Sequence, residues 1–309
     1  MDDMTLIDRS AEFDDSAHDI ILPGFPTGPL GTVLAASRRI FHTRLAGFGL
    51  AVLGLLIFLA LFAGVLAPYD PNEQTLTSVL QAPSAAHLFG TDDLGRDILS
   101  RVIFGSRVSL EVGLISVSVA LVGGCLIGLV AGYWGGLVDE GLMRAMDALA
   151  AFPALILALA ITAALGMGIG NAMIAIGVVY IPGFARLVRG QALSVRERDF
   201  VMAARALGAG NGRIVLRHIW PNVTAPIIVQ ASLSVGFAII TEAALSFLGV
   251  GVRPPTASWG SMLSEGYQYL ETAPWMSIAP GAAIFVAVLG MNLLGDGLRT
   301  ALDPRLSRR

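Results

Sequence analysis

Long apolar runs with almost no charged residues constrain this chain more than any other feature of its sequence. A helix needs about 20 apolar residues to cross a hydrocarbon core about 30 Å thick. Runs of this kind occupy residues 45–67, 112–138, 148–185, 223–247 and 273–294. Only 14% of the 309 residues are charged, whereas a soluble protein carries roughly 25%. The sequence therefore predicts an all-α protein that crosses a membrane several times.

The run at residues 148–185 is too long for one span. A turn over residues 166–171, which holds three glycines and an asparagine, divides it into a third and a fourth span. These spans contain Pro153 and Pro182, which neighbouring helices can accommodate in a membrane. We therefore expect six transmembrane helices. The first follows a polar tail and is longer than the apolar part of a signal peptide, so we expect it to be retained.

The distribution of arginine predicts the orientation of the spans, because cytoplasmic segments carry an excess of basic residues. If the N-terminus is cytoplasmic, sixteen of the 20 basic residues fall on the cytoplasmic side. The other four are Arg96, Arg101, Arg107 and Arg253. We therefore expect both termini in the cytoplasm.

The side chains that most enzymes use for chemistry are scarce. The chain has no lysine, the residue with which a P-loop ATPase holds phosphates. Its single cysteine, Cys125, can form no intrachain disulfide, and cysteine and histidine are too few for a Cys/His zinc site. The sequence shows no nucleophile–base arrangement, and a net charge of −3 disfavours nucleic-acid binding. We expect no catalytic residue, metal site, cofactor or nucleic-acid partner.

Glycines recur at every fourth position of the second span. They are Gly124, Gly128, Gly132 and Gly136. Small residues at this spacing share one helix face and allow two membrane helices to approach closely. The partner helix belongs either to this chain or to another subunit. Cys125 is interpreted as an apolar packing residue, while Tyr133 and Trp134 are expected to anchor the end of the span at the membrane interface.

The connection between the fourth and fifth spans, residues 191–222, begins with a short helical pattern. Asp199 can cap a helix over residues 200–207, and Gly208 can end it in a left-handed turn. Phe200 and Leu207 fall on one face of this helix at helical spacing.

A second short helix can start at residue 211 or 212 and stop at Pro221, before the fifth span. Helices of this length are unstable alone in water, so both need a surface to dock against. They fit either a groove in another protein or a basic loop that rests on anionic lipid headgroups.

The same segment resembles the coupling-loop motif of permeases in ABC importers. In that motif Glu-Ala-Ala is followed by three residues, a glycine, nine residues and a segment that ends in proline. Ala203, Ala204, Gly208 and Pro221 stand at matching positions, and Met202 replaces the glutamate. The resemblance implies that separate ATPase subunits contact this loop. The residues expected at that contact are Phe200, Val201, Ala203, Ala204, Leu207, Gly208, Arg213, Arg217, His218 and Pro221.

Three further stretches, residues 89–101, 242–260 and 292–305, are similar to the dipeptide/oligopeptide branch of that family. The motifs follow the family's order from about residue 40 to the end of the chain. The resemblance implies the transmembrane domain of a type I ABC importer, in the subunit usually called the C-type permease. It also implies a place in the bacterial inner membrane.

The resemblance also implies partners. They are a second homologous permease, two ATP-binding subunits, an extracytoplasmic solute-binding protein and membrane lipid. The expected solute is a dipeptide, an oligopeptide or a similar small polar molecule, with a nickel chelate, glutathione or an opine as alternatives. An ion-coupled secondary transporter is disfavoured, because it would need several paired acids or bases within its spans.

The expected organisation follows from these elements. A cytoplasmic tail (1–44) precedes the first span (45–67) and an extracytoplasmic loop (68–108). A core of five helices (109–296) contains the coupling loop (191–222). A second cytoplasmic tail (297–309) ends the chain.

Glu242 is the only acidic residue in the fifth apolar run, toward its extracytoplasmic end. An acid in the membrane normally faces the bundle interior or water and has a partner. Glu242 therefore either lines the translocation path or its gate, or forms a structural pair with Arg253 or Arg96.

A group of acids, Asp92, Asp93 and Asp97, precedes the second span and suggests either a cation site or a helix N-terminus begun by Thr91. The arginines interleaved with these acids favour the helix N-terminus. The isolated histidines His18, His42 and His87 are assigned no chemistry.

Overall fold

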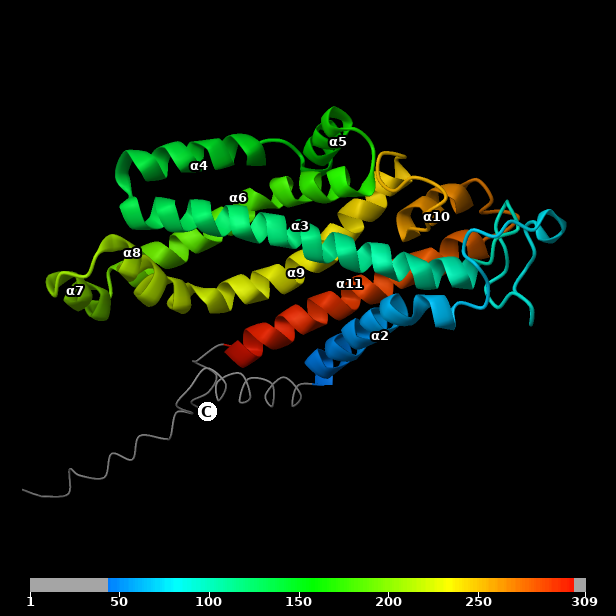
Figure 1. Cartoon of the computed structure of the whole chain (residues 1–309), viewed down its shortest axis with the longest axis horizontal. Coiled ribbons are helices and arrows are strands. Elements are labelled where there is room, and N and C mark those ends of the chain that lie inside the picture. The colour runs from blue at the N-terminus through cyan, green and yellow to red at the C-terminus, as the bar shows by residue number, and fades with distance from the viewer. Residues whose placement is uncertain (1–43, 303–309) are drawn as a thin grey trace, which may run out of the picture.

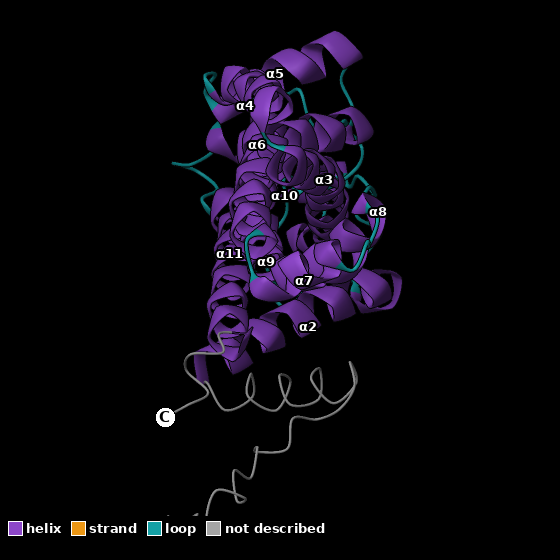
Figure 2. Ribbon diagram, turned by 90° about the vertical axis from the view of Figure 1, so that its left-hand side faces the viewer, coloured by secondary structure: helices purple, strands orange, loops and turns teal. Residues whose placement is uncertain are grey.

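A computed structural model describes residues 44–302, and this part of the chain is built from helices and their connections (Figures 1 and 2). The expected tails over residues 1–43 and 303–309, together with His18 and His42, lie outside the described residues. The elements are α2 (Arg44–Leu66), η2 (Leu76–Ser78), α3 (Ile98–Trp134), α4 (Gly136–Ala150), α5 (Ala154–Leu165), α6 (Ile169–Arg196), α7 (Asp199–Ala206), α8 (Asn211–Arg213), η3 (Ile214–Ile219), α9 (Trp220–Phe247), α10 (Trp259–Tyr267) and α11 (Trp275–Leu302).

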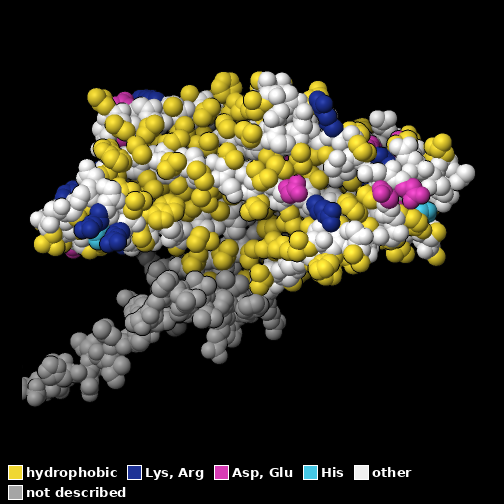
Figure 3. All heavy atoms as spheres, in the orientation of Figure 1, with side chains coloured by type: hydrophobic (Ala, Val, Ile, Leu, Met, Phe, Trp, Pro, Cys, Tyr) yellow, Lys and Arg dark blue, Asp and Glu magenta, His cyan; other side chains and the backbone are white. Residues whose placement is uncertain are grey.

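Long helices that run along the longest axis of the molecule form a bundle (Figure 1). Within residues 44–302, five helical segments are long and apolar enough to cross a membrane: α2, α3, α6, α11 and the continuous segment Asn211–Phe247. On the face seen in Figure 3, hydrophobic side chains cover most of the surface between the two ends, where most of the charged side chains gather. The predicted all-α membrane fold is confirmed.

The third span is not the single helix containing Pro153 that the sequence predicts. The pair α4 and α5 meets the same length and composition test, but the two helices are bent by 92° at the break between them. Pro153 stands in the cap position before α5, and the residue before a proline is driven away from helical conformation. Counting the bent pair as one span gives the six expected crossings. Pro182 does lie inside its helix, α6.

Two boundaries of the predicted organisation shift. The helix α3 begins at Ile98 rather than after a loop that ends at residue 108. Asp97 caps it, because its Oδ2 accepts hydrogen bonds from the backbone N–H (2.8 Å) and the hydroxyl (2.7 Å) of Ser100. Arg101 and Arg107 lie in this first part of α3, before the apolar run begins, so the sequence predicted a later start. At the other end, α11 continues to Leu302, so residues 297–302 are helical rather than part of a tail.

The glycine face of α3 packs against α6 of the same chain. A Cβ atom added to Gly124 would lie 3.0 Å from the backbone nitrogen of Ala185, and one added to Gly128 would lie 2.7 Å from Cβ of Val188. A Cβ on Gly132 would lie 2.8 Å from that of Ala192. The intrachain alternative is therefore correct for these three glycines. Gly136 is not part of the face, because α3 ends at Trp134 and no atom lies within 4 Å of a Cβ at this position. Cys125 is buried in the same helix, as expected.

The close approach of α3 and α6 predicts that Gly128→Ala destabilises the protein. The added methyl group overpacks the contact at a cost of about 1–3 kcal/mol, although alanine is the better helix former. Gly141→Ala in α4 is the matched control, because its Cβ would meet no atom within 4 Å. Thermal unfolding of the purified protein in detergent should give a lower midpoint for Gly128→Ala only. Equal midpoints for the two variants would contradict the packing.

Candidate coupling site

Residues 199–219 (α7, α8 and η3), called the handle below, project at one end of the bundle (Figure 1). Gly208 follows α7 with a φ of +80°, which suits a residue without Cβ, and so ends the helix in the expected left-handed turn. The predicted cap is wrong by one position. Arg198 holds the cap position, and Asp199 is the first residue of α7, where its charge favours the helix N-terminus.

Several large apolar side chains of the handle are exposed in the described chain. Val201, Ile214 and Ile219 are buried against the bundle and fix the handle in place. The side chains of Phe200, Met202, Leu207 and Leu216 are 41%, 48%, 88% and 66% exposed. Of the other expected coupling residues, Ala203, Arg213, Arg217 and Pro221 are exposed, whereas Ala204 and His218 are half-buried. All the predicted coupling residues except Pro221, which lies in α9, therefore belong to the handle.

Pro221 does not end the second short helix. Residues 211–247 form one continuous helical segment of 37 residues, in which η3 is a π-helical stretch and Pro221 lies in the first turn of α9. Proline is tolerated in a first turn, where its missing N–H is least needed. The side chain of Asn222 donates a hydrogen bond to the carbonyl of His218 (2.7 Å).

Contacts that the sequence did not predict hold the handle and the end of α6 against α3. The hydroxyl of Tyr133, a buried side chain, donates a hydrogen bond to Oδ1 of Asn211 (2.8 Å). The guanidinium of Arg196 donates to the carbonyls of Gly132 (3.3 Å) and Tyr133 (3.0 Å). Tyr133 is therefore not the interface anchor that we expected, although its neighbour Trp134 is exposed.

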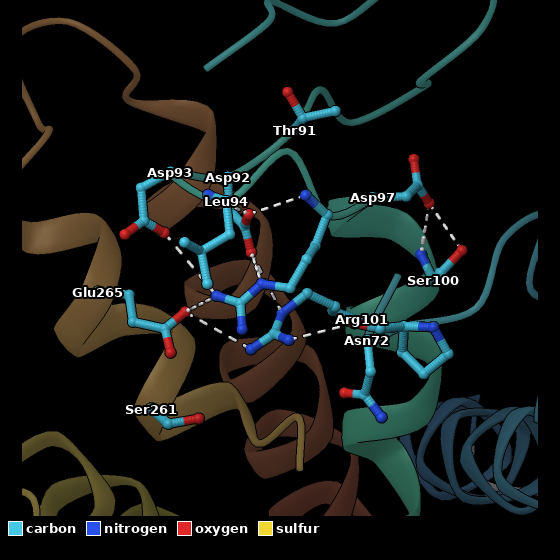
Figure 4. Close-up of polar contacts among 12 residues, drawn as sticks. Asn72, Thr91, Asp92, Asp93, Leu94, Asp97, Ser100, Arg101, Ser261 and Glu265 are labelled. Carbon is cyan, nitrogen blue, oxygen red and sulfur yellow. Dashed lines mark hydrogen bonds and ion pairs between the residues drawn. The ribbon is translucent and has the colours of Figure 1, made fainter. Parts of the chain in front are cut away.

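The opposite end of the bundle carries a second folded region, residues 67–97 and 248–267, called the cap below (Figure 1). Buried ion pairs join its two parts. Arg96 binds Asp92 (2.5 Å) and Glu265 (2.8 Å), and Arg101 lies 3.6 Å from Asp92 and 3.5 Å from Glu265. Figure 4 shows Glu265 of α10 pointing toward Arg101 of α3.

These contacts distinguish between the two alternatives for the acids before α3, a cation site and a helix N-terminus. The predicted helix N-terminus is present, but Asp97 rather than Thr91 caps α3. Its Oδ1 also lies 3.0 Å from Nδ1 of His87, so His87 is not isolated. Asp92, Asp93 and Glu265 have carboxylate oxygens within 4.8 Å of one another, but arginine guanidinium groups already lie among them. Burial raises the pKa of Glu265 above its ordinary value, and the charges of Arg101 and Arg96 act against that rise.

Glu242 is 1% exposed near the cap end of α9. Its Oε1 accepts a hydrogen bond from the hydroxyl of Ser246 (2.6 Å), whereas Oε2 has no hydrogen-bond partner among the described residues. Within residues 44–302 it forms no ion pair with Arg253 or Arg96. The expectation of a structural pair with either arginine is wrong, since the acids of the cap engage Arg96.

A cavity of about 300 Å³, called the elbow pocket below, opens where α4 and α5 meet at their bend. Its lining comes from the bend, from α6 and from α9, and consists of Leu149, Ala150, Phe152, Ala154, Val179, Tyr180, Pro182, Gly183, Phe184, Arg186, Gln230 and Ser234. Arg186 of the lining lies 3.3 Å from Asp147 of α4, and both side chains are half exposed. The lining of the pocket thus includes the polar side chains Arg186, Gln230 and Ser234.

Comparison with known proteins places the chain in a family. Residues 124–308 match the family model described as a binding-protein-dependent transport system inner membrane component. Residues 35–83 match the N-terminal TM domain of oligopeptide transport permease C. The chain belongs to this family of inner-membrane transport components. It is thus a multi-pass subunit of an ABC importer, and the resemblance drawn from the sequence motifs is confirmed.

Curated relatives match most of this permease. The dipeptide transport system permease protein of Alkalihalophilus pseudofirmus is 48% identical over 271 residues, which is 88% of this chain and 89% of the relative. The di/tripeptide transport system permease protein of Pseudomonas aeruginosa is 48% identical over 271 residues, covering 86% of this chain and 89% of the relative. A glutathione transport system permease protein of Pectobacterium atrosepticum is 46% identical, covering 87% and 90%.

The fold has a solved counterpart. A chain of the MetNI methionine ABC transporter in an inward-facing conformation superposes with a TM-score of 0.55 at 18% identity, covering 67% of this permease and 98% of that chain. This similarity concerns the fold alone, and it agrees with the predicted ABC importer transmembrane domain.

The buried ion pairs at the cap lead us to predict that Arg101→Gln loosens this end of the permease. Removing one partner of a buried ion-pair network costs about 3–5 kcal/mol, because it leaves buried charges unpaired. Limited proteolysis should therefore cut residues 67–97 faster in Arg101→Gln than in the parent. Arg253→Gln, which changes an exposed arginine of the same end, is the control. Equal cleavage of both variants would show that the network does not hold the cap.

Proposed function

We propose that this permease forms part of the translocation path of an ATP-driven importer of peptides, and that it carries out no chemistry itself. The solute follows from the relatives, whose names specify dipeptides or di- and tripeptides. Glutathione, itself a small peptide, is the second candidate because a glutathione permease is 46% identical to this chain. A separate solute-binding protein would supply most of the selectivity, and a second homologous permease would complete the path across the lipid bilayer.

The orientation we propose places the handle in the cytoplasm and the cap outside. Sixteen of the 20 basic residues then fall on the cytoplasmic side with both termini. Seven of these sixteen lie between Arg186 and Arg217, at the handle end of α6 and in the handle itself. The four arginines outside include Arg96 and Arg101, whose charges are paired with acids in the cap.

One observation supports the coupling role most directly. In the described chain the handle exposes apolar side chains, which would face the aqueous cytoplasm. Leu207 is 88% exposed and Leu216 66% exposed, and α7 has only eight residues, too few to be stable alone. A groove on an ATPase subunit would bury these exposed side chains. ATP-driven closure of two such subunits would then move the handle and, through the continuous segment 211–247, the bundle.

We assign the residues that line the elbow pocket to the wall of the translocation path. Arg186 and Asp147 are half exposed in the isolated chain, although each lies roughly 15 Å along its helix from the handle end, by the 1.5 Å rise per residue. Charges at such a depth normally face the bundle interior or a water-filled cavity rather than lipid. The pair is exposed, so its net stabilisation is within about 1 kcal/mol, and a polar solute can replace either partner at small cost.

The coupling role predicts that Gly208→Asp reduces uptake at least tenfold in membrane vesicles that hold the assembled transporter. Aspartate at a φ of +80° strains the turn and places a charge beside the exposed apolar side chains of the handle. Gly210→Asp is the control, since Gly210 has an ordinary φ of −67° and aspartate suits its helix-cap position. Full uptake by Gly208→Asp, with the ATPase subunits retained in a pull-down, would contradict the proposal.

If the elbow pocket lines the translocation path, two cysteine variants of α9 should react with a thiol reagent at different rates. Gln230 lines the elbow pocket, whereas Ile228 is 48% exposed and outside the lining. In the assembled transporter a charged thiol reagent should label Gln230→Cys at least ten times faster than Ile228→Cys. The natural Cys125 is buried and adds little background. Similar rates at both positions would place the path elsewhere.

A further inference from the structure

Glu242 lies where three parts of the chain converge: the last turns of α9, the connection over residues 248–258, and the start of α10. The hydroxyl of Ser246 donates its hydrogen to Oε1 of Glu242 (2.6 Å) and accepts a hydrogen bond from the backbone N–H of Val252 (3.0 Å). Because the carboxylate engages the hydroxyl hydrogen, the oxygen lone pairs of Ser246 are left for Val252. Glu242 thereby sets the direction in which the connection leaves α9.

The backbone of the cap rests directly on α9 around this carboxylate. A Cβ added to Gly251 would lie 2.8 Å from Cα of Ser246, and one added to Gly260 would lie 2.6 Å from Cα of Ala243. Ser258, which caps α10 by accepting a hydrogen bond from the N–H of Ser261 (3.1 Å), lies next to the carboxylate. We call Glu242, Ser246, Gly251, Ser258 and Gly260 the seat of the cap.

The seat is linked to both ends of the molecule. On the cap side, α10 carries Glu265 (Figure 4), which binds Arg96 (2.8 Å), so the seat is connected to residues 67–97. On the other side, α9 continues into η3 and α8 without a break in the helix. A displacement of the cap therefore reaches the handle through α9 itself.

We propose that Glu242 is a positioning residue that couples the cap to α9, so that docking of the solute-binding protein on the cap is transmitted to the handle. This inference rests on the proposed function, which places the cap outside, on the side where a solute-binding protein would dock. It replaces the gate interpretation, because Glu242 is 1% exposed and does not line the elbow pocket. The hydrogen bond to Ser246, rather than the negative charge, is the feature that matters.

The test is the stimulation of ATP hydrolysis by liganded binding protein in the assembled transporter, reconstituted in lipid. Glu242→Ala should raise the half-maximal concentration of binding protein about tenfold, the order expected when the buried hydroxyl of Ser246 loses its hydrogen-bond acceptor. Basal ATP hydrolysis should stay within about twofold of the parent. Ser246→Ala should reproduce the loss, and Glu242→Gln should restore most of it, because its amide oxygen can still accept from Ser246.

Glu271→Gln is the matched control, because it makes the same change at an exposed acid of the same end, and it should leave the stimulation unchanged. If Glu242→Gln is as impaired as Glu242→Ala, or if uptake falls while stimulation is unaltered, the proposal is overturned and a charge-dependent gate is favoured. If Glu242→Ala does not assemble, Ser246→Ala, which removes only a hydroxyl, decides the matter. A parent complex that binding protein does not stimulate would overturn the proposed function itself.

Discussion

In a bilayer the backbone has to satisfy its own hydrogen bonds, and this constraint shapes the segment on which the rest of the structure depends. Residues 211–247 remain helical through Pro221 and Pro226. The side chain of Asn222 donates to the carbonyl of His218 (2.7 Å), and the hydroxyl of Thr224 donates to that of Pro221 (2.9 Å). Because the helix continues, one element runs from the handle to the start of the cap, rather than two elements joined by a loop.

The bundle holds this segment through contacts of different strength. Glycines bring α3 and α6 within backbone contact, and α3 in turn fixes the handle through Tyr133 and the cap through Asp97. The cap adds buried ion pairs, whereas the exposed pair of Arg186 and Asp147 contributes little to stability. The rigid contacts thus lie at the two ends and along α3, and the weakly held polar groups lie at the elbow pocket. That distribution suits a protein that alternates between two arrangements of its helices.

The sequence predicted those features that local chemistry determines. Charge-free runs located the spans, and Gly208 located the left-handed turn after α7. The bend before α5 and the passage of the helix through Pro221 were not predicted, because the same residue either breaks or continues a helix according to its neighbours. The site was predicted as a set of handle residues, but its tether between Tyr133 and Asn211 joins residues 78 positions apart. The cap pair of Arg96 and Glu265 spans 169 positions, so only the fold brings them together.

The central claim is that the handle is the surface through which an ATPase subunit acts on this permease. The most direct measurement places a photoreactive amino acid at Leu207, the side chain that is 88% exposed, and identifies what it crosslinks in the assembled transporter in its native membrane. The account predicts a crosslink to an ATPase subunit whose yield changes when ATP is bound. Crosslinks to lipid alone, or to the solute-binding protein on the opposite side of the membrane, would contradict it.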